Sequence, residues 1–284
     1  KYDLNNYILL NKENGGLCSA RNCGLTHASG EWIFFLDSDD WLENNALSTL
    51  VECLEQNPSD LVFGGIRAVN EKTGESEVWD HYPKSVGRIP EEWDGLHSFE
   101  YCWGRLYRKT VIDKYNMRFD TRILYAEDNA WQLDYVSKIQ SYSCTKAVIY
   151  NYRINRSGSM TSKLVYPTMK YYNWEHLLSF IHSYKEEEIT DALKTNYTFT
   201  RVVWSILIAV VSSKIIEGDY NAAHAIKKLP FARKAVKEYV PRTRKDKIYR
   251  TIWILSFQVL CLMVRIYYKN FTKFRNSALI QKIS

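Results

Sequence analysis

The sequence GEWIFFLDSDDW, residues 30–41, decides which fold and which site this chain can build. Its apolar run WIFFL is short and continuous, which is typical of a strand covered on both faces of an α/β sheet. Three carboxylates, Asp37, Asp39 and Asp40, follow within four positions. In open α/β sheets, ligands bind just beyond the carboxyl ends of the strands. We therefore expect the three acids to lie where a ligand binds.

The spacing of the acids alone leaves two interpretations open. Carboxylates this close repel one another unless a cation or hydrogen-bond donors hold them, and clustered oxygen ligands suit Mg²⁺ or Mn²⁺. Asp and Ser are also ordinary turn and helix-cap residues. Asp40 or Asn44 can simply cap the helix that the apolar spacing predicts over residues 45–56.

Further blocks surround this stretch. The run NGGLCSARNCGL at 14–25 leads through ASGE into the strand, AED stands at 126–128, and YNYR at 150–153 is followed by two nearby serines. In this order and spacing the blocks resemble the family 2 glycosyltransferases, over roughly residues 5–162. The resemblance implies a GT-A fold, which is a Rossmann-like mixed α/β sheet flanked by helices. It also implies an inverting enzyme that moves a sugar from a nucleotide-sugar donor to a saccharide or lipid-linked acceptor.

The resemblance assigns donor-binding roles to three of these residues. Asp39 would hold Mg²⁺ or Mn²⁺, and Asp37 would contact the nucleotide ribose or the ion. Arg21 matches an arginine that faces the nucleotide diphosphate, on a helix expected over residues 20–28 with Ser19 as its cap. Judged without the resemblance, Arg21 is equally well a solvated helix residue.

Two other donor-side residues have competing interpretations. Trp103 can stack on a sugar ring, although a core tryptophan is the commoner case. Arg153 and Arg156 lie in a segment, 153–163, that we expect to be a polar loop. Their guanidinium groups can reach the diphosphate, or the loop can simply be solvated. The polar residues 80–97 are expected to form a loop over the acceptor side.

The acidic pair Glu127 and Asp128 opens a helix predicted over residues 127–137. Carboxylates are favoured at a helix N-terminus whether or not they take part in catalysis. The resemblance makes Asp128 the base that takes the proton from the acceptor hydroxyl, with Glu127 beside it. A helix end that lowers the pKa of Asp128 would keep this carboxylate ionised.

The family's first strand and its DDGSTD loop have no counterpart after Lys1. We therefore expect a GT-A domain over residues 1–165 that lacks its first strands. The alternative function is a non-catalytic remnant or a membrane-docking protein. Among the remaining elements we expect a short buried strand at 7–10, a strand at 60–67 and a strand at 147–150. The two glycines of the strand at 60–67 allow either close backbone approach by a substrate or a bulge, and the bulge is the favoured interpretation.

Residues 166–284 are predicted to form a helical, basic C-terminal region. Residues 231–284 hold 13 Lys or Arg and only 2 Asp or Glu, although the net charge of the whole chain is only +6. A buried helix is expected at 202–211 and an amphipathic one at 252–264, with Trp253, Tyr267 and Tyr268 as interface residues. Either this region docks on a membrane surface or it is a small soluble bundle.

Composition and cysteine usage limit where the chain works. With 46% hydrophobic and 25% charged residues, it is an ordinary globular sequence. The six cysteines have no metal-finger spacing, so we interpret them as reduced core residues of a cytoplasmic protein. The charge comes without a nucleic-acid-binding motif, so nucleic acid is not an expected partner. The expected location is peripheral, on the inner face of the cell membrane. The resemblance implies a role in bacterial surface polysaccharide synthesis.

Overall fold

The computed structural model of the 284-residue chain describes residues 7–79, 86–88, 101–123, 126–155, 172–195, 197–241 and 244–275. The chain divides into two compact units. One unit comprises residues 1–89 and 101–159, and the other comprises residues 90–100 and 160–284. Our sequence-based boundary at 165 falls in the stretch 156–171, outside the described residues.

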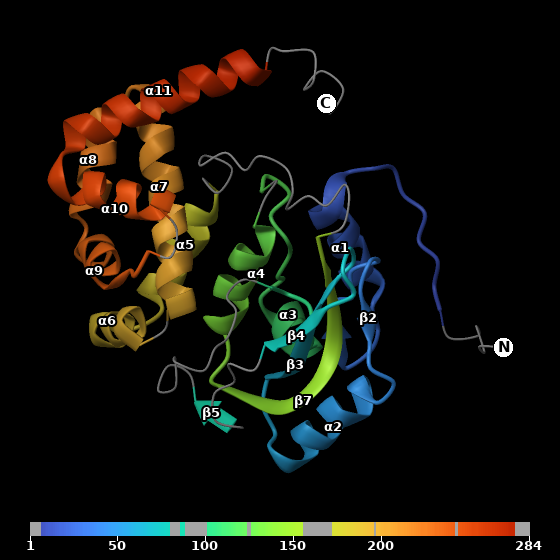
Figure 1. Ribbon diagram of the computed structural model, residues 1–284. Coiled ribbons are helices and arrows are strands. Elements are labelled where there is room, and N and C mark those ends of the chain that lie inside the picture. The colour runs from blue at the N-terminus through green and yellow to red at the C-terminus, as the bar shows by residue number, and fades with distance from the viewer. Residues whose placement is uncertain are drawn as a thin grey trace. The chain divides into compact units, whose positions relative to one another are not determined.

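The first unit is built around a mixed β-sheet (Figure 1). Within the described residues the strand order is β1-β6-β3-β7-β2, with β4 paired to β3 and β5 paired to β7. The central pair β3–β7 is parallel, and the other pairs are antiparallel. The strands are β1 Trp32–Phe34, β2 Trp41–Leu42, β3 Leu61–Asn70, β4 Ser76–Trp79, β5 Val86–Arg88, β6 Arg105–Arg108 and β7 Ser141–Ile154.

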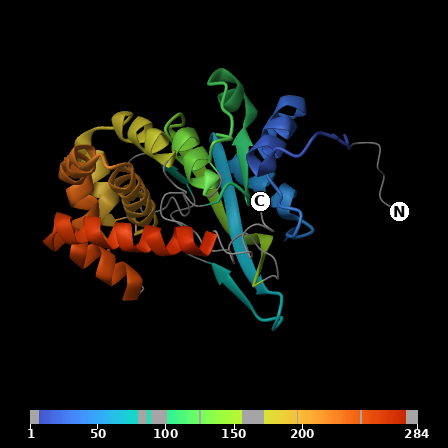
Figure 2. The same ribbon diagram turned by 90° about the horizontal axis from the view of Figure 1, so that it is seen from above.

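Helices cover both faces of this sheet, which confirms the predicted GT-A arrangement of a mixed sheet flanked by helices. They are α1 Gly16–His27, α2 Ala46–Gln56, α3 Lys109–Lys114 and α4 Glu127–Val136. Successive strand residues point to opposite faces. Leu106 therefore packs in a cluster with Leu50 of α2, while Tyr107 meets the Trp131 and Tyr135 rings of α4. Figure 2 shows α2 and α4 on opposite sides of the strands.

The two glycines of β3 produce a bulge, as predicted. The pairing with β7 shifts register between Phe63 and Ile66. A Cβ on Gly64 would lie 2.6 Å from the Ile149 side chain, and one on Gly65 would lie 2.8 Å from the Ala147 carbonyl oxygen. The close approach is therefore between the two strands themselves.

Several predicted boundaries are wrong. Residues 7–10 form no strand, and Ile8 and Leu9 are 71% and 75% exposed. α1 begins at Gly16, whose amide donates a hydrogen bond to the Asn14 side chain. Ser19 therefore lies inside the helix and does not cap it.

Two segments expected to be loops contain strand. Within 80–97 the structure describes β5, at 86–88, and the rest of that segment lies outside the described residues. β7 extends to Ile154, so Arg153 is a strand residue. Pairing with β3 continues to the end of β7, where Ile154 is opposite Asn70, and this pairing explains the extra length.

The second unit is helical, as expected. Its helices are α5 Asn173–His182, α6 Glu186–Thr195, α7 Tyr197–Glu217, α8 Tyr220–Lys228, α9 Pro230–Glu238, α10 Arg244–Leu255 and α11 Phe257–Arg275 (Figure 1). α7 contains the predicted buried stretch 202–211, and Val203, Ile206 and Leu207 are fully buried. Residues 199–217 are long and apolar enough to cross a bilayer, but 67% of the most apolar window is buried, as in a core helix.

The helix predicted over 252–264 is two helices separated at Ser256. The Ser256 hydroxyl accepts a hydrogen bond from the Val259 amide, and a serine that accepts such a bond favours a new helix start. Trp253 is 4% exposed and packs edge-on against Trp204, so its predicted role as an interface residue is wrong. The side chains of Tyr267 and Tyr268 lie outside the described residues.

Candidate functional site

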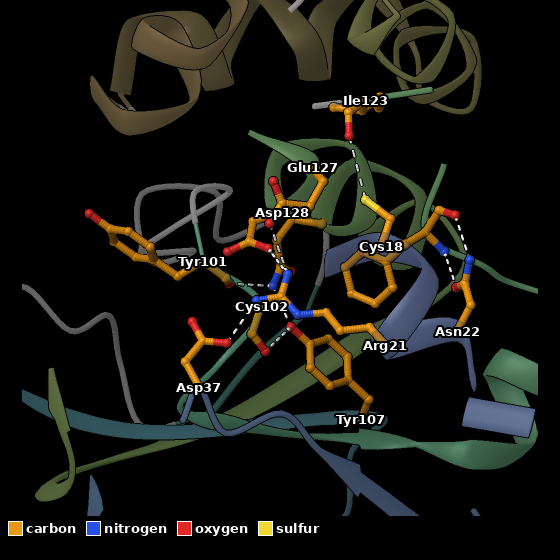
Figure 3. A network of polar contacts seen from close by, with 12 residues as sticks. Cys18, Arg21, Asn22, Asp37, Tyr101, Cys102, Tyr107, Ile123, Glu127 and Asp128 are labelled. Atoms are coloured by element: carbon orange, nitrogen blue, oxygen red, sulfur yellow. Dashed lines mark hydrogen bonds and ion pairs between the residues drawn. The ribbon is translucent and has the colours of Figure 1, made fainter. Parts of the chain in front are cut away.

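One arginine joins the acidic turn after β1 to the acidic start of α4 (Figure 3). Arg21 Nη2 lies 2.9 Å from Asp37 Oδ1, and Arg21 Nη1 lies 3.0 Å from Glu127 Oε1 and 2.7 Å from Asp128 Oδ1. The Arg21 side chain is only 8% exposed. Four residues predicted from separate motifs therefore form one largely buried ionic cluster.

Local structure fixes this arrangement. Asn22, next to Arg21 on α1, exchanges two hydrogen bonds with the Phe119 backbone, at 2.8 Å and 2.7 Å. The Phe119 ring lies under the Arg21 guanidinium and stacks on Trp131 of α4. Ala126 has a left-handed backbone (φ 62°) directly before α4 begins. α1 and α4 are thus held so that their charged side chains meet.

Burial controls the charge of Glu127. It raises the pKa of Glu127 to about 7, the neighbouring Asp128 adds to the rise, and Arg21 opposes it. The same desolvation raises the pKa of Asp37, against the lowering effect of Arg21. The sequence-based expectation, that the helix end keeps a carboxylate ionised, concerned Asp128. For its neighbour Glu127, desolvation is the largest cause of the shift.

A set of buried hydrogen bonds near the ionic cluster was not predicted from the sequence. Cys102 is fully buried, and its carbonyl oxygen accepts a hydrogen bond from the Tyr107 hydroxyl at 2.9 Å. Gln132, on α4, donates to the Tyr101 carbonyl oxygen and also contacts the Tyr107 hydroxyl. A glutamine among the apolar residues of α4 was the only available signal, and it did not indicate a partner.

The end of β7 contacts the acidic turn. The Tyr150 hydroxyl donates to Asp40 Oδ2 at 2.7 Å and accepts from the Asp37 amide at 3.3 Å. The Arg153 amide donates to Asp40 Oδ1 at 2.9 Å, and Arg153 Nε donates to the Asp39 carbonyl oxygen at 2.9 Å. Asp40 therefore bonds to β7 and does not cap α2, which has no side-chain cap.

The carboxylates at this turn fit one mode of metal binding. Within the described part of the chain, no three His, Cys, Asp or Glu side chains are placed to form a metal cage. Mg²⁺ commonly uses one or two carboxylates together with substrate phosphates. Asp39 is half-buried, and its charge adds to the rise in the pKa of Asp37 and of Asp40. Such accumulated negative charge is what a divalent cation would neutralise.

Trp103 differs from its predicted role. It is 2% exposed and stacks on Tyr150, Tyr101 and Tyr152 with ring centroids 4.6, 4.5 and 4.8 Å away. This packing corresponds to the core alternative. The burial of Trp103 argues against its assignment to sugar stacking. Arg156 lies outside the described residues.

The comparisons with known proteins agree with the geometry. Residues 1–116 match the family model described as "Glycosyl transferase family 2". The chain is 27% identical over 225 residues to the minor teichoic acid biosynthesis protein GgaB of Bacillus subtilis, covering 76% of this chain and 25% of that protein. It is 30% identical over 178 residues to the uncharacterized glycosyltransferase EpsJ of Bacillus subtilis, covering 60% and 49%. The chain thus spans at most about half the length of these relatives.

A solved structure supports the fold. The crystal structure of Staphylococcus aureus TarS residues 1–349 in complex with UDP-GlcNAc matches with a TM-score of 0.50 and 15% identity, covering 81% of this chain and 72% of that one. At this identity the similarity concerns the fold alone. Together with the family match, it confirms the GT-A architecture that the sequence resemblance implied.

Proposed function

We propose that this chain, whose residues 1–116 match the model of glycosyltransferase family 2, transfers a sugar from a nucleotide-diphosphate sugar to an acceptor hydroxyl, with inversion. The observation that carries the proposal is the Arg21 bridge between Asp37 and Asp128. A donor-side acid and a candidate base lie on one guanidinium, so the leaving diphosphate and the attacking hydroxyl would meet there.

Arg21 is the proposed cation for the donor diphosphate. Guanidinium groups match phosphate oxygens, and Arg21 is nearly buried, where its charge acts strongly. Asp39, with Asp37, would hold Mg²⁺ or Mn²⁺. When bound, such an ion supplies positive charge that stabilises the negative charge growing on the departing diphosphate.

Asp128 is the proposed general base. The acceptor hydroxyl would give its proton to a carboxylate oxygen of Asp128 while its own oxygen forms a bond to the anomeric carbon. The bond from that carbon to the diphosphate breaks, and the electron pair leaves with the diphosphate. Attack opposite the leaving group inverts the centre. Glu127 shares Arg21 with this base and would tune the local charge.

The names of the relatives suggest the substrate class. The Bacillus subtilis relative is named for teichoic acid biosynthesis, and a Staphylococcus aureus relative is named poly(ribitol-phosphate) beta-N-acetylglucosaminyltransferase TarP. The Staphylococcus aureus TarS structure with this fold holds UDP-GlcNAc. We therefore extend the proposal to a uridine-type donor and a saccharide or lipid-linked acceptor of a bacterial surface polymer.

We also propose a peripheral location on the inner face of the cell membrane. On α11, the residues Val259, Leu262 and Ile266 are 45%, 59% and 53% exposed and follow one another at helical spacing. Residues 231–284, with 13 Lys or Arg against 2 Asp or Glu, carry a larger positive charge than the net +6 of the whole chain. Apolar side chains beside Lys and Arg favour an anionic lipid surface.

Calorimetric titration with UDP and Mn²⁺ tests the catalytic proposal. We expect binding by the wild-type chain that EDTA abolishes, and Asp39→Asn should lose the metal-dependent part while the thermal midpoint stays close to the wild-type value. Glu43→Gln, at another half-buried carboxylate next to the turn, is the control that should keep binding. Absence of UDP binding by the wild-type chain would contradict the proposal and favour the non-catalytic alternative.

A further inference from the structure

The last residues of β7 form a set of contacts with the turn Asp37–Trp41 that the proposed chemistry does not use. Tyr150, a largely buried residue, bonds through its hydroxyl both to the Asp40 carboxylate and to the Asp37 amide. Leu42 pairs with Tyr150 and Trp41 with Asn151 in the β2–β7 ladder. The turn is therefore held at its first residue, at its fourth and by the strand that follows.

Arg153 completes this attachment. Its amide and its Nε donate to Asp40 and to the Asp39 carbonyl oxygen, both at 2.9 Å. Its Nη1 lies 3.2 Å from Glu71 Oε1, and its guanidinium carbon lies 5.3 Å from the Trp41 ring centroid. Three donors of Arg153 are thus engaged within the chain. This differs from the role expected for Arg153, which was to bind the donor diphosphate.

Asp40 differs in kind from the other two acids of the turn. Each of its carboxylate oxygens accepts a hydrogen bond from β7, one from an amide and one from a phenol. Asp37 instead faces Arg21. A carboxylate that accepts short hydrogen bonds on both oxygens is well suited to hold a loop.

We propose that Tyr150, Arg153 and Asp40 are positioning residues that hold the turn so that Asp37 and Asp39 meet the donor in a fixed geometry. The inference rests on the proposed function and names the groups that preorganise its donor site. Preorganised ligands lose little freedom on binding, so loosening the turn weakens donor binding even when Asp37 and Asp39 are untouched.

Tyr150→Phe is the decisive variant. It removes the hydroxyl and keeps the ring that stacks on Trp103 at 4.6 Å and 12°. Losing a hydrogen bond to a charged group commonly weakens an interaction by about tenfold. We therefore expect the Kd for UDP with Mn²⁺ and the KM for the donor to rise by about tenfold, with the acceptor KM unchanged.

Tyr152→Phe is the matched control. It makes the same change two residues further along β7, in a ring that packs against Trp103 and Trp79. It should leave donor binding within about twofold of wild type, which is a change of less than 1 kcal/mol. An unchanged Kd in Tyr150→Phe, or an equal rise in Tyr152→Phe, would overturn the inference.

Asp40→Asn separates positioning from metal binding. An asparagine can still accept from the Arg153 amide through its oxygen and can donate from its NH2 group to the Tyr150 hydroxyl, but it lacks the charge of a carboxylate metal ligand. Asp40→Asn should retain Mn²⁺-dependent UDP binding, whereas Asp39→Asn should lose it. Loss in both variants would make Asp40 a ligand and refute the positioning role. No UDP binding by the wild-type chain would instead defeat the proposed function, so the two failures are distinguishable.

Discussion

The carboxylate of Asp128 lies 2.7 Å from Arg21, whose other terminal nitrogen is paired with Asp37. The cation that would meet the donor diphosphate therefore holds the candidate base in the donor-free chain. A bound diphosphate would compete for the same guanidinium and leave Asp128 free to accept a proton. In this geometry, donor binding would therefore be coupled to activation of the proposed base.

Arg21 should matter for stability as well as for activity. Arg21→Met keeps an unbranched side chain but leaves Asp37, Glu127 and Asp128 without their shared partner. Removing one member of a buried ion pair typically costs about 3–5 kcal/mol. We expect a loss of that size in the free energy of unfolding measured by urea denaturation at pH 7.

Arg122→Met is the control for this measurement. Arg122 pairs with Asp120 at 2.6 Å, but its side chain is 50% exposed. Exposed pairs contribute about 0–1 kcal/mol, so the control should change stability little. Equal losses in the two variants would show that the Arg21 cluster is not a buried network.

Asp128→Asn should stop the chemical step without removing the donor site. A general base contributes about 10²–10⁴ in rate, so kcat should fall by that range while the KM for the donor does not rise. Asp134→Asn, at the other end of α4, is the control. A variant at Asp128 that keeps wild-type kcat would assign the proton to another group.

The pH dependence of stability follows from Glu127, whose pKa in the folded chain is raised to about 7 from its usual 4.5. The folded chain then binds more protons than the unfolded chain between these two values. The stabilising contribution is full below about 4.5 and is lost as the pH rises through about 7. Urea midpoints should therefore fall between pH 5 and pH 8.

Glu127→Gln isolates this contribution, because the amide does not titrate. Its stability should depend less on pH over the same window. Part of the slope should remain, since burial also raises the pKa of Asp40, to about 6. A variant with the full wild-type slope would show that Glu127 is already ionised in the folded chain.

The sequence predicted which residues gather at the site more reliably than how each one is used. Arg21, Asp37, Glu127 and Asp128 come together because strand, helix and motif order determine where the chain returns to the sheet. The partners of each residue depend on distances of a few ångströms that a pattern does not encode.

Two residues illustrate the difference. Trp103 and Arg153 both occur in family-like segments, yet one is packed among tyrosines and the other bonds to the acidic turn. The extension of β7 past Tyr150 decides the second case, because it places the Arg153 amide opposite Asp40. The polar residues of this segment predict a loop, and the strand is recognised only from its pairing with β3.

Membrane docking should be tested on exposed side chains of α11 and not by truncation. Deleting residues 246–284 would uncover core side chains, because Trp253, Leu260 and Val264 are buried. Leu262→Gln instead removes one apolar group that is 59% exposed. Burying a leucine contributes about 1.5–3 kcal/mol, so affinity for phosphatidylglycerol vesicles should fall at least about tenfold.

Leu47→Gln, at a 51% exposed leucine on α2, should bind these vesicles as wild type does in co-sedimentation. Equal binding by the Leu262 variant, or wild-type binding to neutral phosphatidylcholine vesicles as strong as to anionic ones, would contradict docking through α11. Dimers in light scattering that Leu262→Gln disperses would assign this face to a second copy of the chain.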